Sequence, residues 1–242
     1  MRIGILQCDS IMDEYRSQFE NYPEMFRTLL GTQDPTIEFE TFDVEHGHYP
    51  PTVDRCDGYV ITGSKASVYE NEDWIRRFGD YLRVLHESRT PVVGICFGHQ
   101  LLAQALGGKT EKSSKGWGVG IHTSLVVQKK EWQQPPLQKM SILVSHQDQV
   151  VQLPKDAELI VSSEFCPNGG FQIGSHILSF QGHPEFTKPY SQTMMNHRRE
   201  KLGEEVYQKG VTSLNQEIDS PLIARWIISF FVQALAKKGQ PE

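Results

Sequence analysis

Cysteine is scarce in this sequence. Only 4 of its 242 residues are cysteines, and they stand far apart, at positions 8, 56, 96 and 166. Because no two of them form a Cys-x-x-Cys pair, we do not expect a zinc site built on thiolates. Isolated cysteines in this number do not make a disulfide framework either, which favours a reducing compartment. We therefore expect a cytoplasmic protein that carries neither a metal nor another cofactor.

The sequence also lacks long apolar runs and clusters of basic residues. Its formal net charge is −6, with 30 acidic against 24 basic side chains, so the composition does not favour nucleic acid as a partner. The most apolar late segment, WIISFFVQALA, is too short to span a bilayer. The apolar run near the first residue is shorter than a secretory signal requires. We expect neither a membrane segment nor a nucleic-acid partner.

The first half of the sequence alternates between strand and helix patterns. Short apolar or alternating runs predict strands, and an apolar stripe at helical spacing predicts an amphipathic helix. The predicted strands are residues 2–6, 37–42, 58–61 and 91–95, and the predicted helices are residues 72–89 and 99–106. Such alternation favours a parallel sheet with helices on both of its faces.

After Gly116 the pattern changes to several strand-like pieces with few helices between them, which fits antiparallel additions to the sheet. We expect two helices to close the chain, within residues 188–238. The last of them carries an apolar stripe made of Leu222, Ile223, Trp226, Ile227, Phe230 and Phe231. The prediction is one α/β domain over residues 1–242, with a central, mostly parallel sheet flanked by helices.

Cys96 stands in the pattern Gly94-x-Cys96-x-Gly98, between a predicted strand and a predicted helix. A strand that turns abruptly into a helix holds the turn residue in a strained conformation and exposes its side chain. Glycines on either side leave room for the turn and for a substrate. The positive end of the helix favours a thiolate. A nucleophile and a buried structural cysteine are both consistent with this motif taken alone.

A base for such a nucleophile is available in SFQGHPEF, where His183 and Glu185 follow another predicted strand. A cysteine nucleophile needs a base and usually a carboxylate that orients it. In parallel sheets, sites form at the carboxyl ends of the strands, so Cys96 and His183 can share one edge. Pro184 restricts the backbone between the histidine and the glutamate. The alternative is an exposed loop histidine beside a surface glutamate.

The two motifs together carry a family resemblance. GICFGHQ followed by QGHPEF is similar to the paired motifs of the class I glutamine amidotransferases. The sequence most resembles stand-alone members related to the glutaminase part of GMP synthase. The likeness runs from about residue 58 through residue 186. It implies a flavodoxin-like fold and a glutamine amidotransferase or glutaminase activity that releases glutamate and ammonia.

The resemblance also assigns roles to residues of this sequence. It implies that Cys96 attacks the side-chain amide carbon of glutamine, that His183 transfers the protons and that Glu185 orients His183. Backbone groups of three residues would form an oxyanion hole: Phe97, Gly63 and Ser64. Four residues would contact the substrate: Gln100, Gly170, Phe171 and His146.

The sequence does not determine which leaving group departs from the γ-glutamyl carbon, ammonia or a larger amine. GMP synthase carries an ATP-pyrophosphatase domain after its glutaminase domain, and no phosphate loop of that type follows Phe186 here. Either ammonia passes to a separate synthetase chain, or the enzyme is a γ-glutamyl peptidase that acts on glutathione-like compounds. Residues 61–75 and GICFGHQ resemble that second branch. The third hypothesis is that the protein is a non-catalytic regulator that binds a partner.

Two further motifs suggest chemistry that we do not expect. ALGGKT, residues 105–110, is similar to the end of a phosphate-binding loop, but Ala103 replaces the glycine that the pattern needs. The acidic and histidine residues of DVEHGHYP resemble a metal site in composition. We expect a solvated acidic loop there.

Overall fold

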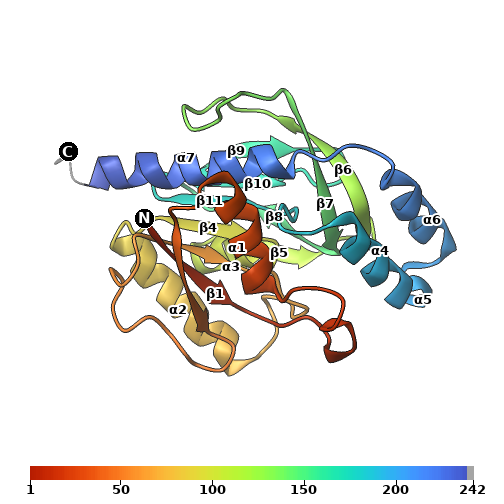
Figure 1. Ribbon diagram of the computed structural model, residues 1–242, viewed down its shortest axis with the longest axis horizontal. Coiled ribbons are helices and arrows are strands. Elements are labelled where there is room, and N and C mark those ends of the chain that lie inside the picture. Colours follow the sequence, from red (N-terminus) through yellow and green to blue (C-terminus); the bar gives the residue numbers. More distant parts are fainter. Residues whose placement is uncertain (239–242) are drawn as a thin grey trace.

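A nine-stranded sheet forms the middle layer of the molecule (Figure 1). The computed structural model describes residues 1–238. The order of the strands in this sheet is β2-β1-β3-β4-β11-β10-β9-β6-β7, and β5 and β8 form a separate two-stranded sheet. The strands are β1 (Arg2–Gln7), β2 (Glu38–Asp43), β3 (Gly58–Ile61), β4 (Val92–Ile95), β5 (Lys109–Lys112), β6 (Gly118–Val126), β7 (Lys139–His146), β8 (Asp148–Gln152), β9 (Ala157–Ser162), β10 (Gly170–Ile173) and β11 (Ile177–Phe180).

Five neighbouring strands of the large sheet run parallel. β1 pairs with β2 and β3, and β4 pairs with β3 and β11, all in parallel register. The inner strands β3, β4 and β11 are buried along their whole length, as expected for strands that are covered on both faces. The order of the five strands is that of a doubly wound α/β fold, in which ligands bind at the carboxyl ends of the strands. The predicted fold class is confirmed.

Antiparallel strands extend the sheet beyond β11, as the change of pattern after Gly116 predicts. β10 pairs antiparallel with β11 and β9, and β6 pairs antiparallel with β9 and β7. The sequence does not predict the separate pair of β5 and β8. Their segments, KTEK and DQVVQ, are short and largely polar, so neither shows a clear strand pattern.

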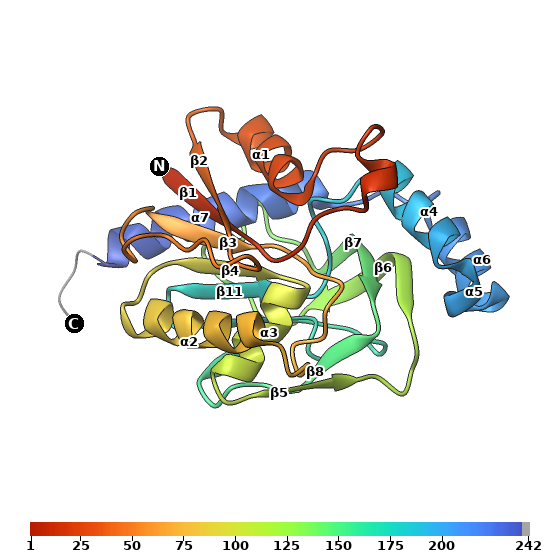
Figure 2. The ribbon, with the colours of Figure 1, turned by 90° about the horizontal axis from the view of Figure 1, so that it is seen from below.

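Helices cover both faces of the large sheet (Figure 2). α1 and α7 pack on one face, and α2 and α3 pack on the other, so that two separate hydrophobic cores lie on either side of the strands. The helices are η1 (Asp13–Tyr15, a 3-10 turn), α1 (Tyr22–Gln33), α2 (Asp73–Glu87), α3 (Phe97–Ala105), α4 (Lys188–His197), α5 (Arg199–Leu202), α6 (Glu204–Ser213) and α7 (Ser220–Lys238).

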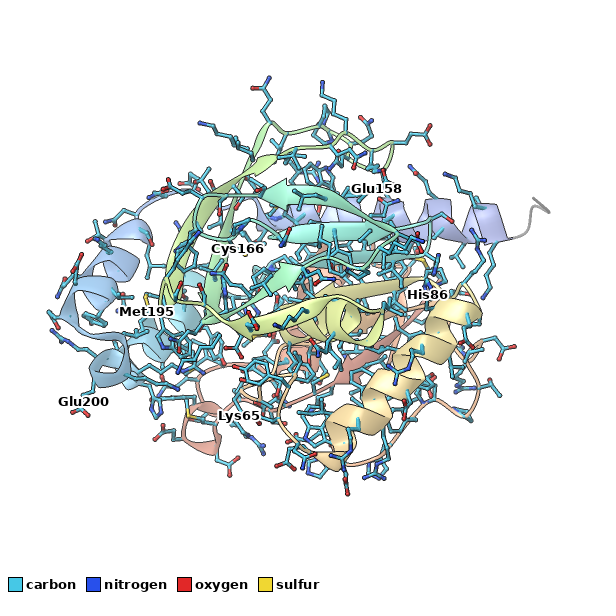
Figure 3. All side chains as sticks on the ribbon, turned by 180° about the vertical axis from the view of Figure 1, so that it is seen from behind. Lys65, His86, Glu158, Cys166, Met195 and Glu200 are labelled. Carbon is cyan, nitrogen blue, oxygen red and sulfur yellow. The ribbon has the colours of Figure 1, made fainter. Side chains whose placement is uncertain are left out.

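Four helices follow β11 within residues 1–238, and the expectation of two was wrong. α4, α5 and α6 lie together beside β6 and β7 at one end of the molecule (Figure 1). Figure 3 shows Glu200 of α5 at the opposite end of the molecule from His86 of α2. The additional helices lack a clear apolar stripe, because α5 has only 4 residues and α6 buries only Gly210. The sequence pattern therefore does not separate them.

α7 buries the apolar stripe that the sequence predicts. Ile223, Trp226, Ile227, Phe230 and Phe231 are buried, and Leu222 is half-buried. The indole N–H of Trp226 donates to the Pro135 carbonyl at 3.0 Å, and its ring meets Trp132 edge-on with 5.8 Å between the centroids. Across residues 1–238, neither α7 nor another helix is both long and apolar enough to cross a membrane.

We expect Trp226→Ala to lower the free energy of unfolding by about 3–5 kcal/mol, because a large buried side chain is replaced by a cavity. Val232 lies on the same helix and is 56% exposed. Val232→Ala is the control, and it should change the free energy of unfolding by less than about 0.5 kcal/mol. Denaturant titration of both variants, followed by circular dichroism, measures the difference. Equal losses in the two variants would contradict the assigned packing of α7.

Candidate active site

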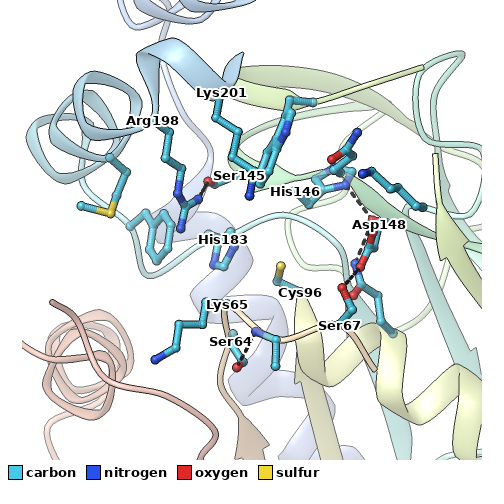
Figure 4. Close-up of a pocket in the computed structure, with 18 of the residues that line it drawn as sticks. Ser64, Lys65, Ser67, Cys96, Ser145, His146, Asp148, His183, Arg198 and Lys201 are labelled. Carbon is cyan, nitrogen blue, oxygen red and sulfur yellow. Dashed lines mark hydrogen bonds between the residues drawn. The ribbon is translucent and has the colours of Figure 1, made fainter. Parts of the chain in front are cut away.

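Neighbouring parallel strands end at one edge of the sheet and place polar residues around a single cavity. Gly63 follows β3, Cys96 follows β4, and Gln181 follows β11. Ile95 and Phe180 are register partners, so β4 and β11 end level with each other. The cavity has a volume of about 310 Å³ (Figure 4). Its lining includes Gly63, Ser64, Cys96, Gln100, His146 and His183.

Cys96 occupies a sharp turn between β4 and α3. Its φ is 51° and its ψ is −97°, a conformation that costs a non-glycine residue of the order of 1–3 kcal/mol. The turn brings backbones very close together, since a Cβ on Gly94 would lie 2.7 Å from the Gly98 carbonyl, and a Cβ on Gly98 would lie 2.7 Å from Ile61. The glycines therefore make room for the turn, as predicted. Neither glycine lines the cavity, and the expectation that they also leave room for a substrate stays a prediction.

His183 and Glu185 form a buried pair beside Cys96. Nδ1 of His183 lies 2.7 Å from Oε1 of Glu185, and the two side chains are 4% and 0% exposed. The backbone N–H of His183 donates to the Leu143 carbonyl at 2.7 Å, and the Phe186 ring stacks on the imidazole with 3.8 Å between the centroids. The imidazole is thereby held facing Cys96, its second hydrogen-bond partner (Figure 4).

The electrostatics of this pair keep a proton on His183. Burial by itself lowers the pKa of the imidazole. The negative charges of Glu185 and of a Cys96 thiolate, together with hydrogen bonds to both residues, outweigh burial and raise the pKa of His183 to about 10. At neutral pH an imidazolium therefore faces the sulfur, and an adjacent positive charge stabilises the thiolate form of a cysteine.

Gln181 also contacts the Cys96 sulfur, and the sequence analysis assigns this glutamine no role. Its side-chain Nε2 donates to Sγ of Cys96 at 3.5 Å, and its Oε1 accepts from Nε2 of Gln100 at 3.0 Å. Gln181 is buried, and its backbone N–H donates to the Gly169 carbonyl. The amide therefore links the sulfur to the wall that holds Gln100. Its place directly after β11 is the signal that could have identified it.

The turn after β3 lies against the imidazole. A Cβ on Gly63 would lie 2.9 Å from Cε1 of His183, so only glycine leaves the imidazole where it is, whereas the 3.8 Å from that Cβ to Cβ of Cys96 would be an ordinary contact. The turn is fixed from the other side by Asp9, which accepts hydrogen bonds from the backbone N–H and from the ammonium of Lys65, each at 2.9 Å. Gly63 and Ser64 thus line the cavity next to Cys96.

Phe97, the third residue assigned to an oxyanion hole, is the first residue of α3. Helix geometry leaves the first N–H groups of a helix without intrahelical acceptors. The N–H of Phe97 therefore belongs to the same turn as Cys96, while its side chain is buried and stacks on Trp74 with 5.3 Å between the centroids.

The wall opposite His183 is rich in hydrogen-bond acceptors. Gln100 is buried, and its Nε2 donates to the backbone carbonyl of Asp148 at 2.8 Å, which leaves its Oε1 as an acceptor. Nδ1 of His146 donates to the same carbonyl at 3.0 Å. Burial lowers the pKa of His146 to about 3, so the ring is neutral and its Nε2 is an acceptor. The Asp148 carboxylate accepts from Ser67 and Tyr69.

Gly170 and Phe171 do not belong to the lining of the cavity, and their assignment as substrate contacts stays a prediction. Phe171 is completely buried in the core on the α3 side of the sheet and packs against His99 with 5.1 Å between the centroids. Gly170 pairs with Phe180 of β11 and with Val161 of β9. The backbone of β10 forms ladder hydrogen bonds with a strand on each side, β11 and β9, and the sequence does not reveal this double pairing.

The two motifs that the sequence sets aside do not contribute to the lining of this cavity. ALGGKT runs from the end of α3 into β5, the reverse of a phosphate loop, which leads into a helix. In the acidic loop, one ligand atom each of Asp43, Glu45 and His46 lies within 4.8 Å of the others. His46 also forms an ion pair with Asp43 at 2.9 Å. The expectation of a solvated loop stays a prediction.

Comparison with known proteins places this arrangement in a family. The family model described as "Glutamine amidotransferase class-I" matches residues 13–200. Gamma-glutamyl peptidase 3 of Arabidopsis thaliana is 31% identical over 189 residues, which cover 75% of this chain and 74% of that protein. A glutamine-hydrolyzing GMP synthase of Herminiimonas arsenicoxydans is 31% identical over 138 residues, which cover 54% of this chain but 25% of that protein.

A solved structure supports the same fold. The crystal structure of a glutamine amidotransferase from Thermotoga maritima superposes with a TM-score of 0.74 and covers 98% of both chains, at 16% sequence identity. At that level of identity the likeness concerns the fold alone.

We expect iodoacetamide at neutral pH to label Cys96 at least about tenfold faster than the other cysteines, because the imidazolium of His183 lies beside its sulfur and the other cysteines have no such neighbour. Burial raises the pKa of Cys56 to about 11 and of Cys166 to about 12, and it raises the pKa of Cys8 well above its ordinary value. Peptide mass spectrometry after a short exposure measures each site. Cys96→Ser is the control and should leave only the slow sites. Even labelling of all four cysteines would contradict the activation of Cys96 by His183.

The pKa of His183 should fall when its partner carboxylate is removed. In Glu185→Gln the imidazole stays buried but loses the opposite charge, so we expect its pKa to move down by about 1–3 units from the native value. Titration of ¹³C-labelled histidine by NMR follows Cε1 of His183 in both proteins. Glu158→Gln, a change of the same type at a site between Lys130 and Gln128, is the control. An unchanged titration of His183 in Glu185→Gln would show that the Glu185 carboxylate is not what keeps the proton on His183.

Proposed function

Since this chain belongs to the class I glutamine amidotransferase family, we propose that it hydrolyses γ-glutamyl amides, glutamine among them, through a thioester on Cys96. The observation that carries this proposal is the strained turn that holds the Cys96 sulfur against a buried, protonated His183. Cys96 is the nucleophile, His183 is the acid and base, and Glu185 orients His183 and stabilises its charge.

The first half of the reaction forms the thioester. The sulfur attacks the δ-carbon of the γ-glutamyl group, a C–S bond forms, and the carbonyl electrons move onto oxygen. The C–N bond then breaks, and the departing nitrogen takes a proton from Nε2 of His183. Ammonia leaves when the substrate is glutamine, and a free amine leaves when the substrate is a γ-glutamyl peptide. His183 is now neutral.

The second half hydrolyses the thioester. His183 takes a proton from water as the water oxygen attacks the thioester carbon, the C–S bond breaks, and glutamate is released. The thiolate and the imidazolium are restored, so atoms and charges balance over the cycle. The oxyanion of each step is stabilised by backbone N–H groups of Phe97 and of the Gly63–Ser64 turn. The cavity lining at Gly63 and Ser64 supports this assignment.

The acceptor-rich wall suits the amino-acid end of the substrate. Oε1 of Gln100 and Nε2 of the neutral His146 accept hydrogen bonds from the α-ammonium group, close to the Asp148 carboxylate. His146 and Asp148 lie on the side of Cys96 away from His183 (Figure 4). The scissile nitrogen then points toward His183, as proton transfer requires.

A γ-glutamyl peptidase is the second candidate within the same chemistry. It is favoured by the match with gamma-glutamyl peptidase 3, which covers about three quarters of both chains, whereas the match with the GMP synthase covers a quarter of that protein. In an amidotransferase, a separate synthetase chain would accept the ammonia. In a peptidase, the amine is itself the product.

We expect Cys96→Ala to reduce glutamate release by roughly a thousandfold or more, because no thioester can form. Glutamine and γ-glutamyl dipeptides are incubated with each protein, and glutamate, ammonia and the free amine are measured by mass spectrometry. Cys56→Ala is the control, because Cys56 precedes β3 at the other edge of the sheet. Glutamate release that survives in Cys96→Ala, or that is absent from the unaltered protein on all γ-glutamyl compounds, would refute the proposal.

A further inference from the structure

A second cavity shares part of its lining with the cavity at Cys96. This second cavity has a volume of about 730 Å³. Six residues line both cavities: Tyr22, Lys65, Tyr190, Met194, Arg198 and Lys201. None of the acceptors proposed for the amino-acid end of the substrate, Gln100, His146 and Asp148, lines the second cavity. His183 lines only the first cavity, so the nitrogen that it protonates lies there, and a leaving group longer than ammonia would reach the additional space past the six shared residues.

Contacts lead directly from His183 to this junction. Phe186 stacks on the imidazole of His183, and Tyr190 meets Phe186 edge-on with 4.8 Å between the centroids. The positive charge of Arg198 acts on Tyr190 and on Tyr22. Arg198 and Lys201, which follow α4 in the chain, thus lie next to the leaving-group side of the reaction (Figure 4).

Two positive charges share one aromatic ring at this junction. The guanidinium carbon of Arg198 lies 5.6 Å and the ammonium of Lys201 lies 5.0 Å from the centre of the Trp117 ring. Arg198 also donates to Oγ of Ser145 at 2.9 Å. Over residues 1–238, neither cation forms an ion pair with a carboxylate, in contrast to the adjacent Arg199, which pairs with Glu204 at 2.7 Å. Like charges held this close attract an anion.

Lys65 is a weaker candidate for the same task. It lines both cavities, but its ammonium already pairs with Asp9 at 2.9 Å. Among the residues that line both cavities, Arg198 and Lys201 are therefore the cations that are free to take an anion from the substrate.

We infer that Arg198 and Lys201 bind a carboxylate on the leaving group, so that the preferred substrates are γ-glutamyl amino acids or short γ-glutamyl peptides with a free carboxyl end. This inference rests on the proposed γ-glutamyl hydrolysis. A planar guanidinium binds a carboxylate through two parallel hydrogen bonds, and Trp117 keeps it in place. Ammonia, the leaving group of glutamine, makes no use of this site.

The test compares substrates that differ only in that charge. γ-Glutamylglycine and γ-glutamylglycinamide present the same scissile bond, with and without the carboxylate. We expect the unaltered protein to prefer the acid in kcat/KM by roughly 10- to 100-fold, the range for one charge-assisted hydrogen bond. Arg198→Gln and Lys201→Gln should each reduce this preference, mainly through KM for the acid. γ-Glutamylcysteinylglycine and its amide repeat the comparison for a leaving group that is one residue longer.

Arg199→Gln is the matched control, because it removes the same charge one residue away, from a side chain that lines neither cavity. It should keep the full preference for the acid. Equal rates on acid and amide, or equal effects of Arg198→Gln and Arg199→Gln, would overturn the inference while leaving the proposed hydrolysis intact. Calorimetry with Cys96→Ala measures binding of both compounds without turnover. Failure to bind γ-glutamylglycine more tightly than its amide there would also overturn the inference.

Discussion

The hydrogen bond from the backbone N–H of Cys96 to the Phe180 carbonyl, 2.9 Å long, is the contact on which the site depends. It closes the parallel pairing of β4 and β11 at the point where both strands end. One strand then turns into α3 through Cys96, and the other continues into Gln181 and His183. Strand pairing through the backbone thereby places Cys96 and His183, almost ninety positions apart in the sequence, side by side.

Burial and charge act against each other at His183, and the balance gives the site its chemistry. A buried imidazole without partners is neutral, as His146 shows, because burial lowers its pKa to about 3. His183 is just as inaccessible but has Glu185 on one side and the sulfur on the other, and its pKa rises to about 10. Two histidines of one cavity therefore differ in charge at neutral pH. One donates a proton and the other offers an acceptor.

The sequence predicts most of the parallel half of the fold, because β1, β3 and β4 are short apolar runs with clear ends. Cys96, His183 and Glu185 could be named for the same reason, since each stands just after such a run. Phe171 could not be placed, because the sequence does not reveal that β10 has a neighbour on both sides. Arg198 and Lys201 could not be found either. They stand at the end of α4 and in α5, and α5 has only 4 residues, of which only Leu202 is buried, so no pattern marks this segment.

The second cavity also gives the proposed reaction an order of events. The glutamyl group stays attached to Cys96 while the amine occupies the space next to His183, so the water that completes hydrolysis has to enter the space that the amine leaves. A leaving group held by its carboxylate delays that entry. An amine of the same shape that arrives before water would meet the thioester in the same position and re-form an amide. In the proposed reaction, the geometry that selects a leaving group would thus also set how often the glutamyl group is transferred to another amine instead of to water.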